Sequence, residues 1–550
     1  MLAGWIDRPG GRALPLLAGL AFGALYLALL TQQYIGDGMR WYGAMAGLRP
    51  PELGGSNHLL YPLVGKLWFA AGTALGLPAS YALAQSMNAV LGGVALGFFC
   101  AIVQAWTGRA WLALAATLTL GLSRAFSQHG VDMTEPMPGV ACVMAAIWLA
   151  TRHALRPGPR TGLVLAGALL GLGGAIYQSN IIAVFGASAL VGLAGPARGP
   201  RARWIDAALV GLAAGVSAAA LYLFAFMTLG GARTLGEAFA LSVETESART
   251  AGAYAEISLR RVGVLVFGLA DSLYGIRGVD GLGTNLFARG LTREVLVALV
   301  ATGCGVIVPA GIVVFYALRR RAARGEAQDG EGRTLLALLI WLVPQLGLAL
   351  YFGGRYSKLW MLSLAVILLM LCLMLAVLQR RAGRAPRDWR AATALFAGVW
   401  VLPVGFLGLA ANLIPDHVTP QACAIDAVKI AALLKPQDLL VSDWGGLACA
   451  PEAKMATFSL AASAFDRRLV AEDVRRDLDA AMAAARARGG AVYVHGLLDL
   501  SAAEWEPFLG QRLGLPSTFL APERARATPS LTLGATTPQG GAQSLWRVGP

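Results

Sequence analysis

Asp37 is the first acidic residue that could do chemistry, in a polar stretch from Gln32 to Lys66 that follows a long apolar segment. Gly36 and Gly38 flank it, and glycine lets a backbone approach a ligand closely. A carboxylate at a membrane boundary can act as a general base toward an acceptor hydroxyl or amine, or can help to hold a divalent ion such as Mg²⁺ or Mn²⁺. We therefore predict a catalytic role for Asp37, in preference to that of an ordinary anion at a helix end.

A second acidic pair, Asp132 and Glu135, comes just before another apolar run. Asp132 and Glu135 are three residues apart. If a helix begins near Met133, both carboxylates therefore lie near one face of its N-terminus. The alternative interpretation is a capping box, with Asp132 as the N-cap, Glu135 at the third helical position and Pro136 in the first turn. Capping and catalysis can coincide, so we predict that both residues join Asp37 in catalysis, and the three could hold a metal ion.

Five further side chains could bind an anionic group such as a phosphate. His58 and Lys66 follow Asp37 in the chain, and Arg355, Tyr356 and Lys358 share a short polar segment between two apolar runs. Cations there can pair with a phosphate. The alternatives are a polar interfacial histidine, a lysine whose ammonium snorkels to the membrane surface, and an anchor for lipid head groups.

The composition predicts a polytopic α-helical membrane protein. Of the 550 residues, 57% are hydrophobic and only 14% are charged, and the mean hydropathy is +0.60. Eleven apolar runs have about the length of a membrane crossing: 13–31, 82–104, 110–123, 137–151, 162–175, 180–195, 205–229, 294–318, 334–352, 359–378 and 391–412. The first run lacks a cleavage site and should remain as a helix. Two more runs, 59–77 and 262–274, are short or interrupted by Lys66.

Basic residues predict the orientation in the membrane. They cluster at Arg8 and Arg12, Arg109, Arg152 to Arg160, Arg198 to Arg203, Arg319 to Arg324 and Arg380 to Arg390. All these clusters can be cytoplasmic only if neither of the two short runs crosses. The acidic and phosphate-binding candidates then share the opposite, non-cytoplasmic face with the turn at Tyr177 to Ser179. The first 412 residues hold 32 of the 45 Lys and Arg but only 17 of the 31 Asp and Glu, so the net charge of +14 indicates membrane orientation and not nucleic-acid binding.

Residues 413–550 have a different pattern. Segments 425–434 and 471–488 read as helices, 438–442 and 491–495 as strands, and the tail from 528 is weakly patterned. We expect a small soluble α/β domain on the non-cytoplasmic face, following a transmembrane domain of residues 1–412. Asp443 follows the first strand and reads as part of a tight turn, so this domain is expected to act in recognition and not as a second catalytic site.

The six cysteines show no metal-binding spacing. Four lie in apolar runs and read as small core residues. Cys423 and Cys449 lie in the C-terminal domain, where they could form a disulfide or remain free thiols.

The order of the motifs resembles that of a known superfamily, the GT-C membrane glycosyltransferases, which includes lipid-linked-sugar-dependent protein mannosyltransferases and aminoarabinose transferases. The resemblance covers the first 230 or so residues, and the rest only by topology. The residues that carry it are Gly36-Asp37-Gly38, Asn57-His58-Leu59-Leu60-Tyr61-Pro62-Leu63, Lys66 and Asp132-Met133-Thr134-Glu135.

The resemblance implies an inverting glycosyltransferase of the bacterial inner membrane, with its N-terminus cytoplasmic and its C-terminal domain periplasmic. It would transfer a hexosyl or pentosyl group from a polyprenyl-phosphate donor to a lipid, glycan or protein acceptor. Asp37 would match the catalytic carboxylate, and Asp132 or Glu135 the second acidic position. The sequence lacks a paired Asp-Glu at Asp37 and any MIR-type repeat, so it does not select a protein acceptor. The alternative function is a transporter or flippase for a lipid-linked anion, although such relays need ionisable residues within the helices.

Overall fold

The chain divides into two compact units in a computed structural model. The first comprises residues 1–31, 51–78 and 82–415, and the second comprises 32–50, 79–81 and 416–550. The structure describes residues 9–33, 41–42, 45, 58–194, 199–228, 232–243, 259–275, 293–322, 329–352, 357–380, 386–419, 422–443, 456–460, 463–464, 470–510, 513–536 and 542–549.

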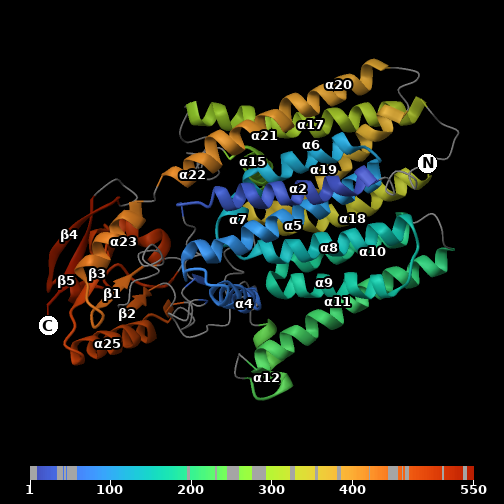
Figure 1. The fold of residues 1–550 in the computed structure, drawn as a ribbon. Coiled ribbons are helices and arrows are strands. Elements are labelled where there is room, and N and C mark those ends of the chain that lie inside the picture. The colour runs from blue at the N-terminus through green and yellow to red at the C-terminus, as the bar shows by residue number, and fades with distance from the viewer. Residues whose placement is uncertain are drawn as a thin grey trace. The chain divides into compact units, whose positions relative to one another are not determined.

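The first unit is helical (Figure 1). Its main helices are α2 (Pro9–Ala28), α4 (Tyr61–Ala74), α5 (Tyr81–Thr107), α6 (Ala110–Leu122), α7 (Arg124–Val131), α8 (Pro136–Leu155), α9 (Thr161–Ile176), α10 (Ala183–Ala189), α11 (Pro200–Thr228), α12 (Leu235–Val243), α15 (Leu259–Tyr274), α17 (Arg293–Ala322), α18 (Asp329–Tyr351), α19 (Ser357–Arg380), α20 (Pro386–Phe396) and α21 (Leu402–Phe406). Helix α22 (Ile414–Val418) contains the boundary between the two units. A short 3-10 helix, Gln178–Ile182, follows α9.

Six helices in the described part of the chain are long and apolar enough to cross a membrane, or seven if the bent pair α6 and α7 is one span. The prediction of a helical membrane protein is therefore confirmed, while the count of about eleven crossings stays a prediction. The two doubtful runs form α4 and α15, which are too short to be among these spans.

Helix α19 is the centre of the first unit. It is apolar around its whole circumference, and nearly every side chain from Leu359 to Leu378 is buried. A helix without a polar face belongs inside a bundle. Because α19 packs against α6, α7, α17 and α18, its N-terminal residues Ser357 and Lys358 are held among other helix ends.

A sharp bend separates α6 from α7 at Ser123. The two helix axes differ by 63°, and Ser123 itself is extended. Gly408 packs so closely here that a β-carbon on it would overlap the carbonyl oxygen of Leu122. The bend turns the chain at the end of a buried helix, and the acidic pair Asp132 and Glu135 follows directly after α7.

The second unit contains a five-stranded mixed sheet with strand order β2-β1-β3-β5-β4. Strand β1 (Leu439–Ser442) is parallel to β2 (Ala456–Ser459) and β3 (Val492–His495). Strand β5 (Ala542–Val548) is antiparallel to β3 and to β4 (Ala527–Thr536). Along β1, Leu439 and Val441 join one core cluster and Leu440 joins another, as alternation along a strand requires. Both faces of this short strand are therefore buried.

The helices and strands predicted in the C-terminal part are confirmed as α23 (Ala422–Leu433), β1, α25 (Ala471–Ala487) and β3. The reading of the tail as weakly patterned is wrong, because it forms β4 and β5. Pro529 obscured the pattern of β4; it is accommodated because β4 is an edge strand, where the missing N–H need not pair.

Candidate active site

Asn88 on α5 anchors the loop that carries the acidic pair. Its side-chain Nδ2 lies 3.2 Å from the carbonyl oxygen of His129, 2.8 Å from that of Asp132 and 2.7 Å from that of Thr134. Asn88 is fully buried. A buried amide that serves several otherwise unpaired carbonyls fixes a loop that has no regular structure of its own. The loop before α8 is thus held rigidly to a long helix.

Glu135 lies in this loop, buried to 2% exposure, and faces two basic side chains. Its Oε1 is 3.8 Å from Nε2 of His58, and its Oε2 is 3.9 Å from Nζ of Lys358. Tyr177, at the end of α9, joins the group: its ring stacks on His58 with a centroid distance of 5.3 Å, and the Lys358 ammonium lies 5.8 Å from its ring centroid. Four segments far apart in the sequence therefore meet around one carboxylate.

The same cluster is held from a second side by His129 and Ser357. The Nδ1 atom of His129 is 2.8 Å from the hydroxyl of Thr134, and its Nε2 is 3.0 Å from the hydroxyl of Ser357. The Ser357 hydroxyl also donates to Oε1 of Gln128 over 3.3 Å. Because Ser357 precedes Lys358 at the start of α19, these bonds fix the position of the lysine relative to the acidic loop.

The capping-box interpretation of the acidic pair is wrong. Helix α8 begins at Pro136, its N-cap is Glu135, and no side chain caps it. The Asp132 carboxylate, fully buried, instead accepts from the backbone N–H of Met133 at 2.7 Å. Pro136 and Pro138 in the first turn of α8 have no N–H to satisfy, and the Glu135 carboxylate faces His58 and Lys358 instead.

The end of the first apolar helix meets the acidic loop. The backbone N–H of Thr31 donates to the carbonyl of Val131 over 3.1 Å. The side chain of Gln85 on α5 lies 3.0 Å from the carbonyl oxygen of Thr31 and 3.3 Å from that of Val131. The backbone just after α2 and the backbone just before Asp132 are therefore at the same end of the first unit.

Of the remaining predicted site residues, the structure describes only the side chain of Lys66. Lys66 is exposed on α4 and makes no ion pair with a described residue. Asp37, Arg355, Tyr356 and Cys449 lie outside the described residues. The Cys423 side chain is likewise not described, so the predicted disulfide stays a prediction.

A metal site is not formed by the described residues alone: no group of three or more His, Cys, Asp or Glu among them could hold an ion. Of the predicted set, only Asp132 and Glu135 are described, and the Glu135 carboxylate faces the basic side chains of His58 and Lys358. These two carboxylates therefore do not fit a divalent ion without further ligands. A metal site that includes Asp37 stays a prediction.

Sequence reasoning missed Asn88 and Tyr177. Asn88 could have been found as an isolated amide within an apolar run, where a polar side chain needs a partner. Tyr177 lies in a short turn already expected on the same face as the acidic pair. It gave no signal of its own, because its role depends on stacking with His58 from a different segment.

No protein-family model matches the sequence, and no curated protein matches it. Solved structures do match this chain. The Archaeoglobus fulgidus oligosaccharyltransferase tethered with an acceptor peptide containing the NVT sequon matches 98% of this chain and 74% of its own, with 13% identity and a TM-score of 0.53. The archaeal oligosaccharyltransferase AglB from Archaeoglobus fulgidus, in complex with an inhibitory peptide and a dolichol-phosphate, matches the same shares with 14% identity and a TM-score of 0.52.

ArnT from Cupriavidus metallidurans in the apo state matches 98% of this chain and 99% of its own, with 13% identity and a TM-score of 0.44. At such low identity, the likeness to the archaeal enzyme establishes a fold and leaves the reaction open. The order of the acidic and basic motifs predicted the same fold. This chain has the fold of the GT-C superfamily of membrane glycosyltransferases.

Proposed function

We propose that this protein is a glycosyltransferase that takes a sugar from a polyprenyl-phosphate donor. The observation that carries the proposal is the buried Glu135 carboxylate with Lys358 and His58 around it, beside the end of α2, in a fold shared with an oligosaccharyltransferase. The AglB structure contains a dolichol-phosphate, which is a polyprenyl phosphate. A lipid-linked donor needs a site at the membrane boundary, where these helix ends meet.

Lys358 and His58 are the proposed phosphate-binding groups. When the anomeric carbon of the sugar is attacked, its bond to the phosphate oxygen breaks and that oxygen keeps the electron pair. Negative charge therefore grows on the departing polyprenyl phosphate, and a positioned ammonium stabilises it. Glu135 holds both basic side chains in place and keeps a counter-charge for them in the resting enzyme. Arg355, Tyr356 and Lys66 are further candidates for the same phosphate.

Asp37 is the proposed general base. It follows Thr31 by six residues, a reach of at most about 20 Å, and the Thr31 backbone is bonded to the chain just before Asp132. The Asp37 carboxylate would take the proton from an acceptor hydroxyl or amine as that group attacks the anomeric carbon. Attack from the face opposite the phosphate inverts the anomeric configuration. Asp132, buried in the adjacent loop, would help to orient the acceptor.

The proposed setting is a bacterial inner membrane, with residues 1–412 as the catalytic transmembrane domain and 413–550 as a periplasmic domain that recognises the acceptor. The acceptor would be a lipid, a glycan or a protein. Transport of a lipid-linked anion is not favoured, because the solved structures that share this fold include an oligosaccharyltransferase.

The test is a transfer assay with the full chain in liposomes and a panel of radiolabelled polyprenyl-phosphate sugars. We expect one donor to be consumed, and Asp37→Asn to lower its turnover by about 100-fold or more, the usual contribution of a general base. Asp479→Asn, on the exposed face of α25, is the matched control and should keep full activity. Consumption of no donor, or full activity in Asp37→Asn, would contradict the proposal.

A further inference from the structure

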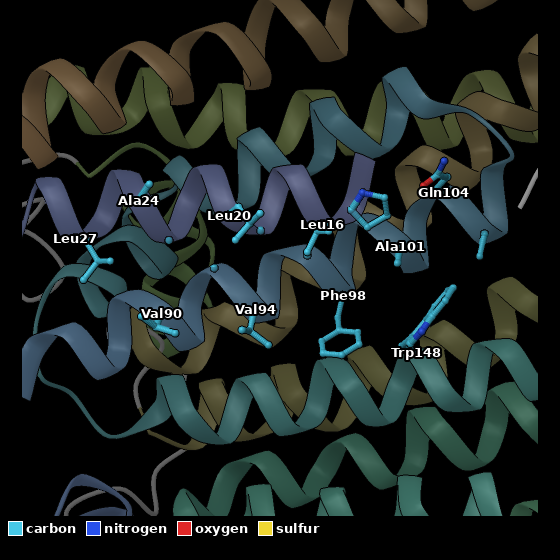
Figure 2. Close-up of a pocket in the computed structure, with 16 residues that line it drawn as sticks. Leu16, Leu20, Ala24, Leu27, Val90, Val94, Phe98, Ala101, Gln104 and Trp148 are labelled. Carbon is cyan, nitrogen blue, oxygen red and sulfur yellow. The ribbon is translucent and has the colours of Figure 1, made fainter. Parts of the chain in front are cut away.

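A groove of about 680 Å³ runs between α2 and α5 and contains none of the residues of the acidic cluster. Leu16, Leu20 and Leu27 line one wall, and Val94 and Phe98 line the other (Figure 2). All three leucines are exposed, Leu16 and Leu20 to more than 60%. In a membrane protein such side chains face lipid, so the groove opens toward the bilayer.

One end of the groove is polar. Gln104 on α5 and Trp148 on α8 line it together (Figure 2). Gln104 is only 5% exposed. Within the described part of the chain, neither its side-chain amide nor the indole N–H of Trp148 makes a hydrogen bond. The amide is therefore available to a ligand in the groove. Two such groups at one end of an apolar groove indicate a ligand that supplies hydrogen-bond acceptors there.

The polar end is the end far from the acidic cluster. Gln104 lies about 24 Å further along α5 than Asn88, which anchors the acidic loop. The end nearer that loop is lined by Ala24, Leu27 and Val90 and offers no polar side chain. The head of a bound lipid would therefore lie beside Gln104, in the leaflet opposite to the candidate active site.

The guanidinium of Arg109 lies near the polar end of the groove. Arg109 follows α5 directly after Gly108, one turn beyond Gln104, and its side chain is exposed. In the described part of the chain it has no acidic partner. An anionic head group whose glycerol lay beside Gln104 would place its phosphate within reach of this guanidinium.

We propose that the groove binds a glycerophospholipid with an anionic head group, such as phosphatidylglycerol. Its acyl chains lie along α2 and α5, its ester carbonyls accept from Gln104 and Trp148, and its phosphate pairs with Arg109. A polyprenyl phosphate has no ester carbonyl for the amide. A helix from a second copy would present backbone groups that are already paired within it, and it would leave the amide unsatisfied.

The test uses the full chain in liposomes that contain phosphatidylglycerol with a photoactivatable diazirine on one acyl chain. After illumination, the labelled peptides are identified by mass spectrometry. We expect label on α2 and α5, and we expect Gln104→Leu to lower it about five-fold through the lost hydrogen bond. Ala101→Trp, which fills the groove beside Gln104, should remove most of it. Matched controls are Gln345→Leu, a buried amide on α18, and Leu212→Trp on the exposed face of α11.

Competition separates the possible occupants. Unlabelled phosphatidylglycerol should displace the label, whereas polyprenyl phosphate and zwitterionic phosphatidylethanolamine should displace it much less. Three outcomes would overturn the proposal: equal labelling in Gln104→Leu and the wild type, stronger displacement by polyprenyl phosphate, or cross-links between two copies through α2. None of them depends on sugar transfer, so failure here and failure of the proposed reaction can be told apart.

Discussion

The buried Glu135 carboxylate lies at the centre of the candidate site. A carboxylate with 2% exposure needs compensating charge, and the lysine and histidine near its two oxygens supply it. The distances of 3.8 and 3.9 Å that join the carboxylate oxygens to Nε2 of His58 and Nζ of Lys358 are longer than hydrogen bonds. Both basic side chains therefore lie near Glu135 without a direct hydrogen bond to it.

At this scale we predict that Lys358→Ala raises the KM for the lipid donor by about ten-fold or more, the loss expected when one charge-assisted bond to a phosphate is removed. Lys358→Arg keeps the charge and should restore much of the affinity. The measurement is initial rate against donor concentration in liposomes.

Lys66→Ala is the comparison for this prediction, because Lys66 lies exposed on α4. A KM unchanged in Lys358→Ala but raised in Lys66→Ala would move the phosphate site away from Glu135.

At the scale of elements, helices were easier to predict from the sequence than the contacts between them. Continuous apolar runs predicted α5, α8, α11 and α19, because burial in a bilayer demands such runs whatever the partners are. The 63° bend at Ser123 could not be predicted in this way. It lies beside a close backbone approach between Leu122 and Gly408, which are almost 300 residues apart.

The anchoring of the acidic loop to α5 gives the next prediction. Asn88→Leu keeps the number and branching of the side-chain heavy atoms but removes the amide that serves the carbonyls of His129, Asp132 and Thr134. Buried carbonyls without donors should cost about 2–3 kcal/mol, and the thermal midpoint should fall by several degrees. The rate of sugar transfer should fall by more than the decrease in folded protein accounts for, because the loop that carries Asp132 and Glu135 loses its position.

Gln345→Leu is the matched variant, since the buried Nε2 of Gln345 has no partner among the described residues and its removal orphans no carbonyl. Thermal unfolding in detergent, followed by fluorescence, compares the two. Equal midpoints would mean that Asn88 does not support the loop.

The crossing of α2 and α5 depends on glycines. A β-carbon on Gly93 would lie 2.6 Å from the carbonyl oxygen of Gly19 and 2.8 Å from the Cα of Gly23, both backbone atoms that cannot turn aside. We therefore predict that Gly93→Ala forces the two helices apart and lowers stability by about 1–3 kcal/mol.

On α11, Gly215 has nothing within 4 Å of an added β-carbon, and Gly215→Ala should leave the thermal midpoint unchanged or raise it through helix propensity. The same fall in both variants would show that the α2–α5 contact is not the cause.

At the scale of the whole molecule, the sequence predicted which segments could share one face, and the structure adds which of them touch. Parity of the basic clusters assigned His58, the acidic pair, the turn at Tyr177 and Lys358 to the same side. These residues do converge around Glu135. The contacts around Glu135 join side chains from different helix ends. No single stretch of sequence can therefore predict them. The edge strands of the C-terminal unit were missed for the same reason, since a strand such as β4 is stabilised mainly by its neighbour.

The orientation in the membrane is the prediction on which the site's access to its substrates depends. A single cysteine is added to a variant in which Cys423 and Cys449 are replaced by serine. Its reaction with a thiol reagent shows on which side of the membrane that position lies. Ala484→Cys lies on the exposed face of α25, and Arg201→Cys lies exposed near the start of α11, within a basic cluster. Because positive charge is retained in the cytoplasm, a membrane-impermeant maleimide should label Ala484→Cys in intact spheroplasts and Arg201→Cys only after permeabilisation.

Labelling in the reverse pattern would place the C-terminal unit, and with it the chain that leads into Asp37, in the cytoplasm. The lipid-linked donor would then have to be used on the face where it is made and not after it has crossed the membrane. Labelling of both positions in intact spheroplasts would require an odd change in the number of crossings between α11 and α25. In that case α15 would be the first to examine, because it is the short run between these two helices and parity alone assigned it to one side.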